Sequence, residues 1–320
     1  MTIKKSLLTG LVFVLSAGVL VSDGYAAKKL DLKLKLKKGQ KFAMRTVTDQ
    51  KILQTVMGQE QKMNQMTAIG MSFEVLAVDT DGAISIKTIY QTIQARIESL
   101  MGVMEYDSTK PEQTGKNNPI LSVYKAMLGQ SFVMKISPKG GIIAIEGIDE
   151  MMEKMIDKMA TDENMKQQMK EMMKNFISEE KMKEMSASMV TAFPRKPVAV
   201  GDSWTNKMSI SAGFPMEIDT TCTLTEYKDG IFTIRTNSKI EPPDKAEPIE
   251  MGPVKMTMRM KGEQKGTTEI NEATGWMVRS KVNMKFSGEL KMEPNEQMPE
   301  GMTIPMVVDS VITVEPMEVK

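Results

Sequence analysis

Alternating apolar and polar residues predict β-strands along most of the chain. In residues 29–37 the leucines from Leu30 to Leu36 occupy every second position, and lysines and an aspartate occupy the others. A period of two is typical of a half-buried strand. Similar runs predict strands at 41–57, 62–79, 83–98, 131–137, 142–147, 203–213, 219–227, 231–239, 249–271, 276–292 and 302–317.

The period becomes helical between Asp149 and Ala192. Met151, Met155 and Met159 recur every four residues, and charged residues fill most of the positions between them. This spacing predicts two or three amphipathic helices. A second methionine stripe contains Met165, Met169, Met172 and Met173, and a third contains Met182, Met185 and Met189. A further short helix is predicted near 120–128.

Short matches in the same order indicate an internal repeat. Gly39-Gln-Lys-Phe42 matches Gly201-Asp-Ser-Trp204, Asp81–Thr88 matches Asp229–Thr236, and Ile136–Gly141 matches Ile270–Gly275. Leu76 and Leu224 stand at equal distances before the second pair of segments. The glycine and the aromatic residue occur a third time in Gly129-Gln-Ser-Phe132. Three ordered matches favour duplication of one β-rich unit.

These patterns predict an α+β protein. Two related antiparallel β-rich units, residues 27–148 and 194–320, would form a curved sheet or a pair of half-barrels. The Met-rich amphipathic helices at 149–193 would be an insertion between the two units.

The first 26 residues have the pattern of a secretory signal peptide. Lys4 and Lys5 precede an apolar stretch from Ser6 to Val21, and small residues predict cleavage after Ala26. Cleavage removes two lysines and one aspartate from the 42 basic and 41 acidic residues, so the mature chain has no net charge. It also has no apolar stretch long enough for a membrane span. We expect an exported protein, in the periplasm or outside the cell; an uncleaved membrane anchor is the alternative.

Composition excludes several common chemistries. The 320 residues include no histidine and a single cysteine, Cys222. Histidine-dependent catalysis, an internal disulfide and a cysteine zinc site are therefore excluded. Balanced charge argues against a nucleic-acid partner, which requires a basic excess. We expect a non-enzymatic protein without a cofactor, and a hydrolase using paired carboxylates is the enzymatic alternative.

Methionine provides the candidate site, because the chain has 34 methionines. Methionine is flexible and polarizable, so a methionine face adapts to a lipid, another apolar ligand or a protein partner. Candidate ligand-binding residues are Met151, Met155, Met159, Met165, Met169 and Met173. Thioethers also suit Cu(I), although no metal is favoured. A purely structural or interaction module is the other alternative. Met256, Met258 and Met260 also alternate in a predicted strand, so methionine is frequent throughout the chain and is not confined to the helices.

Three short motifs resemble a known family. They are Leu36-Lys-Lys-Gly39-Gln40-Lys-Phe42, Phe73-Glu-Val-Leu76 before Asp81-Gly82, and Pro197-Val198-Ala-Val-Gly201-Asp202-Ser-Trp204. They are similar to an uncharacterised domain-of-unknown-function family of secreted bacterial proteins and lipoproteins. The resemblance implies export and a β-rich fold, and it implies no activity. This chain lacks the anchoring cysteine of the lipoprotein members.

Overall fold

The computed structural model describes residues 29–100, 102–110, 119–160, 162–176, 183, 193–210, 215–244, 248–251, 254–294 and 299–318. These residues form thirteen strands and three helices. The strands are β1 (Lys41–Val56), β2 (Gln59–Val78), β3 (Ile84–Ser99), β4 (Gly102–Asp107), β5 (Ser131–Ile136), β6 (Ile142–Glu146), β7 (Ser203–Ile210), β8 (Met216–Lys228), β9 (Ile231–Glu241), β10 (Ile249–Met251), β11 (Val254–Asn271), β12 (Met277–Met292) and β13 (Met302–Pro316). The helices are α1 (Pro119–Met127), α2 (Ile148–Met159) and α3 (Glu163–Phe176).

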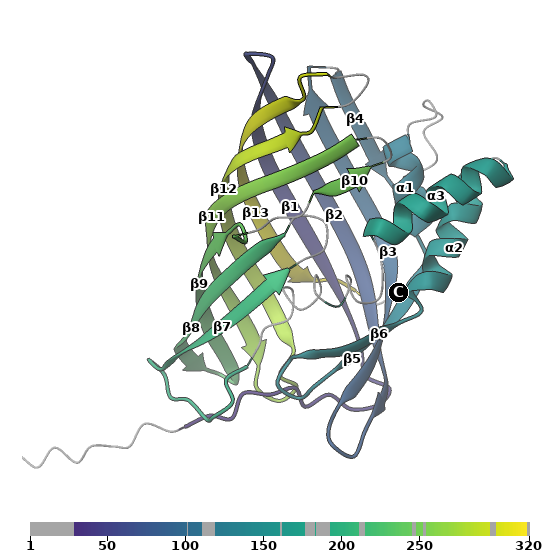
Figure 1. Cartoon of the computed structure of the whole chain (residues 1–320). Coiled ribbons are helices and arrows are strands. Elements are labelled where there is room, and N and C mark those ends of the chain that lie inside the picture. Colours follow the sequence, from purple (N-terminus) through teal and green to yellow (C-terminus); the bar gives the residue numbers. More distant parts are fainter. Residues whose placement is uncertain are drawn as a thin grey trace, which may run out of the picture.

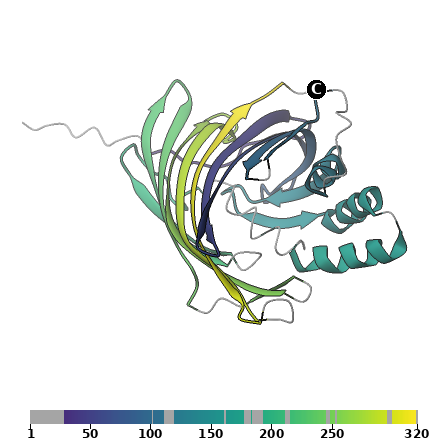
Figure 2. The same ribbon diagram turned by 90° about the horizontal axis from the view of Figure 1, so that it is seen from above.

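All described strands belong to one antiparallel sheet. The strand order is β6-β5-β3-β2-β1-β13-β12-β11-β9-β8-β7, while β4 pairs with β3 and β10 pairs with β11. The long strands run diagonally across a strongly curved surface (Figure 1). Seen from above, the sheet is a crescent, and the helices lie on the side toward which it opens (Figure 2).

The predicted α+β class is wrong, because the fold is mostly β. β1 pairs with β13 from Met44↔Pro316 to Gln54↔Met306, and this ladder joins the two predicted β-rich segments into a single sheet. The described helices are short and lie beside β3, β5 and β6 (Figure 1). They are therefore an addition at one flank of the sheet and not a large helical insertion between two units. The predicted signal peptide and the methionines of the third stripe lie outside the described residues.

Most predicted strands are confirmed within a few residues of their ends. The predicted strand at 249–271 divides into β10 and β11, which pair with each other as a hairpin. The sequence pattern did not predict β4, which pairs with the end of β3 from Gln94↔Asp107 to Ser99↔Gly102. Strand β4 has only six residues, and short edge strands carry little periodic signal.

Residues 29–37 are extended but are not a strand of the sheet. Leu30, Leu32, Leu34 and Leu36 are buried, as the alternation predicts. Backbone bonds go instead to three different segments: Leu30 pairs with Val198, the Leu34 N–H donates to the Pro138 carbonyl at 2.8 Å, and the Lys35 N–H donates to the Thr274 carbonyl at 2.8 Å. The segment thus connects the turn after β5 with the turn after β11.

The hydrophobic core lies between this segment, α2 and the nearby ends of the strands. It draws buried side chains from both halves of the chain, including Val75 and Ile86 from one half and Leu224 and Ile234 from the other. The half-buried Trp276 packs against this core and is stacked on Phe42, with ring centroids 5.1 Å apart. Burial of apolar area contributes about 25 cal/mol per Å², so this shared core stabilises the contact between the two halves.

The three Gly-x-x-aromatic elements share one local structure. At the first, the Gly39 N–H donates to the Val75 carbonyl at 2.8 Å, and the Val75 N–H donates to the Gln40 carbonyl at 2.9 Å. The same two bonds link Gly201 and Asp202 with Leu224 at 2.7 and 3.0 Å, and Gly129 and Gln130 with Tyr90 at 3.0 and 3.1 Å. All three glycines have positive φ, which glycine adopts without steric cost.

These bonds correct one detail of the sequence comparison. Val75, and not Leu76, has the position that corresponds to Leu224, because both accept and donate the bonds of the Gly-x pair. Leu76 falls at a register shift of β2 and is 37% exposed, whereas Leu224 is fully buried. The turn between β2 and β3 is longer than the turn between β8 and β9, so spacing counted from Asp81 misplaces the match by one residue.

The close approach of residues 29–37 to the turn after β11 gives a first prediction. A Cβ atom at Gly275 would lie 2.0 Å from the Lys33 carbonyl oxygen, and φ there is +67°. We expect Gly275→Ala to displace residues 29–37 and to lower the free energy of unfolding by more than about 2 kcal/mol in urea titrations.

The matched control is Gly39→Ala. Gly39 also has positive φ, +82°, but a Cβ atom there would meet nothing within 4 Å. Only the backbone penalty of about 1 kcal/mol is then expected. Equal losses in the two variants would contradict the inferred contact between Gly275 and the segment.

Candidate functional site

The candidate site is the face of the sheet that is turned toward the core and the helices, which we call the concave face (Figure 2). Successive side chains of a strand point to opposite faces, so the registers assign each residue to one face. The core residues Phe73, Ile86 and Leu224 mark the concave face on β2, β3 and β8. Met44 marks it on β1, because it pairs with Met71 beside the core.

Charge is completely separated between the two faces of the long described strands. By register, no Asp, Glu, Lys or Arg has a concave position in β1–β3, β7–β9 or β11–β13. On β11 the opposite, convex face carries Lys255, Arg259, Lys261, Glu263, Lys265 and Glu269. An antiparallel sheet commonly has one solvated face. Here the concave face is free of charge well beyond the core.

A row of uncharged and mostly polar residues crosses the concave face at right angles to the strands. Directly paired residues from β7 to β3 form this row, which we call the polar belt: Asn206, Thr220, Ser238, Gln264, Met284, Ser310, Gln50, Gln65 and Ile97. Within it, the hydroxyls of Thr220 and Ser238 are 2.8 Å apart. Most of its members thus offer amide or hydroxyl groups, which both donate and accept hydrogen bonds.

Beyond the polar belt, on the side away from the core, the concave positions become apolar again. We call this region the apolar zone, and its members are Ile52, Met63, Met208, Ile210, Met216, Ile218, Ile240, Met256, Met258, Met260, Phe286, Leu290, Met292, Met302, Ile304, Met306 and Val308. A few are buried, such as Ile240 and Met260, but most are only half-buried. The cross-strand pair Gln54 and Gln61, joined by a 3.1 Å hydrogen bond, borders the zone on β1 and β2.

Two glycines let the strands come close together in the apolar zone. A Cβ atom at Gly262 would lie 2.1 Å from the Lys285 carbonyl oxygen, and one at Gly288 would lie 2.0 Å from the Arg259 carbonyl oxygen. Glycine inside a strand is typical of bends and of close backbone approach. Gly262 also pairs with Phe286, so the aromatic ring covers the position that lacks a side chain.

The polar belt contains a buried hydroxyl without a partner. Ser310 is only 4% exposed, and its Oγ atom has no hydrogen-bond partner. A buried donor left unsatisfied costs about 1–3 kcal/mol. Some hydroxyls on this face are paired, for example Thr268 with Ser280 at 2.9 Å. The buried Thr88 hydroxyl, on the core side of the belt, also has no partner.

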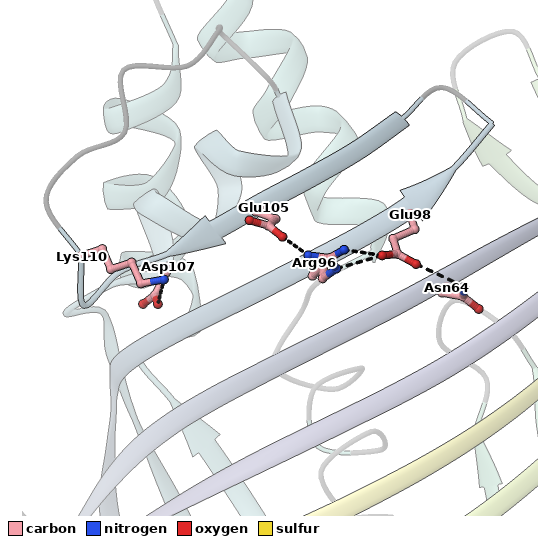
Figure 3. Close-up of polar contacts among 6 residues, drawn as sticks. All are labelled: Asn64, Arg96, Glu98, Glu105, Asp107 and Lys110. Atoms are coloured by element: carbon pink, nitrogen blue, oxygen red, sulfur yellow. Dashed lines mark hydrogen bonds and ion pairs between the residues drawn. The ribbon is translucent and has the colours of Figure 1, made fainter.

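The convex face holds its charges in surface networks, and one of these joins β2, β3 and β4 (Figure 3). Arg96 donates from Nε to the Glu98 carboxylate at 3.0 Å and forms an ion pair with Glu105 on β4. Asn64 on β2 donates to the same Glu98 carboxylate at 3.4 Å. The hydrogen bond from Arg96 lowers the pKa of Glu98, and that from Asn64 lowers it further. These exposed groups connect neighbouring strands, and they form no enclosed site.

A hollow of about 490 Å³ lies across β12, β13, β1, β2 and β3. Its charged lining balances, because Lys51, Arg96 and Lys285 are matched by Asp49, Glu98 and Asp309. It therefore has no preference for an ion of either sign. Among the described residues, no three His, Cys, Asp or Glu side chains come together as a metal site requires.

The methionines predicted as ligand-binding residues do not form one surface. Met151 and Met155 on α2 are buried in the hydrophobic core, and Met159 packs against it. On α3, Met165 is 41% exposed and Met169 is half-buried. Met173 belongs to α3, but its side chain lies outside the described part of the chain.

The methionines of the apolar zone were not selected by sequence reasoning, although their signal was present. Met256, Met258 and Met260 alternate along β11. From the sequence alone, this alternation is explained by the high methionine content of the whole chain. Register pairs the outermost of them with Met292, which in turn pairs with Met302. The alternation was therefore the mark of one continuous face, which only strand pairing makes visible.

Cys222 lies on the concave face, one row from the polar belt toward the core. Burial raises the pKa of its thiol to about 11, and a hydrogen bond from Asn206 opposes that shift only in part. The thiol is therefore protonated at neutral pH and is a poor nucleophile.

Comparison with known proteins identifies a family and no function. A family described as "Family of unknown function (DUF6263)" matches residues 81–277, which is more than half of the chain. No curated protein matches the sequence. None of the described helices combines the length and the hydrophobicity that crossing a membrane requires.

Two solved structures show coarse similarity. One is described as "Lipid-protein interactions in lipovitellin": the alignment has 7% identity and a TM-score of 0.49, and it covers 89% of this chain and 26% of that one. This chain thus spans about a quarter of the lipovitellin chain. The other is Pseudomonas aeruginosa OccK8 (OprE), with 7% identity, a TM-score of 0.16, and coverage of 89% of this chain and 100% of that one. At such similarity neither likeness indicates a shared function.

The positions of the helical methionines predict a contrast in stability. Met155 is 4% exposed, so Met155→Ala should lower the free energy of unfolding by about 2–4 kcal/mol. Met165 is 41% exposed, so Met165→Ala should change it by less than about 0.5 kcal/mol. Chemical denaturation of both variants measures the difference, and a large loss in Met165→Ala would show that α3 is packed more tightly than described.

The raised thiol pKa predicts slow alkylation of Cys222. With a pKa of about 11, the thiolate fraction at pH 8 is on the order of one in a thousand, whereas an unperturbed thiol near pKa 8.5 is about a quarter ionised. Iodoacetamide at pH 8 should modify the folded chain at least a hundredfold more slowly than the chain in urea. Mass spectrometry over time measures both rates, and comparable rates would contradict burial of the thiol.

Proposed function

We propose that the chain binds an apolar ligand on the apolar zone. The proposal rests on the concave face alone, because this chain belongs to the DUF6263 family, whose function is unknown. One observation carries the proposal. Half-buried methionine and aliphatic side chains continue on the concave face past the polar belt, where no charge accompanies them. Contiguous apolar surface of this kind marks binding sites in soluble proteins.

The energetics favour an apolar ligand. Each 100 Å² of apolar surface covered contributes about 2.5 kcal/mol before the costs of ordering are subtracted. Methionine side chains have three rotatable bonds and a polarizable sulfur, so they fit ligands of variable shape. A face built from Met256, Met258, Leu290 and Met302 therefore supports binding of chains such as those of lipids, without a single fixed geometry.

The proposal extends to location. The N-terminal segment expected to be a signal peptide supports action outside the cytoplasm, where apolar molecules have to be carried or stored in water. A carrier in that setting needs no catalytic group, in agreement with the absence of histidine from the sequence. We therefore assign the chain a non-enzymatic, ligand-binding role.

A pair of adjacent valines tests the proposal. Val308 faces the apolar zone between Ile52 and Phe286, whereas its neighbour Val307 lies on the convex face and is 43% exposed. We expect Val308→Asp to weaken binding of a fluorescent fatty-acyl probe by at least tenfold, because a carboxylate on this face must be desolvated. Val307→Asp, with the same change one residue away, should leave affinity within twofold.

Unchanged affinity in Val308→Asp, measured by fluorescence titration, would overturn the proposal, and so would a wild-type chain that binds no acyl probe. Circular dichroism establishes that each variant is folded. Leu290→Gln replaces Val308→Asp if that variant does not fold, since it also faces the apolar zone and introduces no charge.

A further inference from the structure

We infer that the ligand of the concave face is an amphiphile with an uncharged, hydrogen-bonding head group, which lies at the polar belt while its apolar chains cover the apolar zone. The inference rests on the proposed function and adds the chemical class of the ligand. The polar belt and the apolar zone are adjacent rows of the same face, so one elongated molecule reaches both.

Charge complementarity favours an uncharged head group. A phosphate or carboxylate head group needs a cation or a set of converging donors when it leaves water. The described concave positions of the long strands offer no Lys or Arg, since the nearby Lys51 and Lys285 have convex positions. An uncharged head group, such as a glycerol or sugar hydroxyl, avoids this penalty.

The composition of the polar belt favours a ligand that forms hydrogen bonds. Gln50 and Gln65 are a direct cross-strand pair, and Gln50 is also paired with Ser310. Amide and hydroxyl groups donate and accept at once, which matches ligand hydroxyls and amides. The polar belt therefore offers hydrogen-bonding partners to a head group directly beside the apolar zone.

The unpartnered Ser310 hydroxyl gives the head group a specific contact. Its Oγ atom is buried and has no hydrogen-bond partner, and its cross-strand neighbours in the polar belt are Gln50 and Met284. Both neighbours have long, flexible side chains that are able to change rotamer. A head-group hydroxyl placed between them would satisfy Ser310 and remove the cost of leaving it unpaired.

The decisive measurement compares two lipids with the same acyl chains. Dioleoylglycerol has an uncharged hydroxyl head, and dioleoylphosphatidylglycerol carries a phosphate. Competition of each against the fluorescent acyl probe on the full chain should show at least tenfold tighter binding of dioleoylglycerol. Equal affinities, or a preference for the phosphate, would overturn this inference and leave the proposed function standing. Displacement by neither lipid, together with failure to bind the probe, would overturn both.

Variants of the polar belt locate the head group. Gln50→Lys adds a cation to the concave face and should move the preference at least tenfold toward the anionic lipid. Asn283→Lys is the matched control, because Asn283 precedes Met284 on β12 but is exposed on the convex face. It should leave the preference unchanged. The same response in both variants would show that the lysine acts through overall charge and would overturn the placement at the polar belt; Gln65→Lys serves if Gln50→Lys does not fold.

Ser310→Ala separates a binding role from a structural one. Removing an unpaired buried hydroxyl should leave the thermal midpoint unchanged or raise it, while dioleoylglycerol binds at least threefold more weakly. A lower midpoint with unchanged affinity would assign Ser310 to folding alone and would overturn its part in head-group recognition.

Discussion

The antiparallel pairing of β1 with β13 is the constraint on which the rest of the structure depends. It joins the first long strand to the last along eleven residue pairs, from Met44↔Pro316 to Gln54↔Met306. Without this ladder the strands would form two smaller sheets that share only the hydrophobic core at one end. With it, the rows of concave side chains continue from β7 to β3, and both the polar belt and the apolar zone exist only because these rows are continuous.

The sequence supported accurate prediction of local structure and failed at the level of the sheet. Period-two alternation identified most strands, because this signal is local. The pairing of β1 with β13 joins residues far apart in the chain and leaves no local signal. The matched halves therefore predict separate units, and the methionine stripes of α2 and α3 predict a helical insertion between these units. Residues 29–37 show the same limit: alternation predicts which leucines are buried, but not the segments to which the backbone bonds.

The candidate site shows why residue type alone misdirects. The helical spacing of Met151 and Met155 predicts a methionine face. The apolar face of a helix usually packs in the core, and both side chains are buried. Met256, Met258 and Met260 carried the same information in period two. Their meaning depends on Met292 and Met302 on neighbouring strands, which register alone brings beside them. A face shared by many strands cannot be read from any one of them.

The polar belt explains why the apolar zone is not simply more core. Stability of a curved sheet comes from its ladders and from the core that residues 29–37 and α2 close at one end. Beyond that core the concave face tolerates polar side chains, as Gln50, Gln65 and Ser238 demonstrate. Thr or Gln would thus serve folding at the outer positions too, and at lower risk of aggregation. The return to methionine, leucine and isoleucine beyond the belt is therefore the observation that favours the proposed contact with an apolar ligand over a purely structural role.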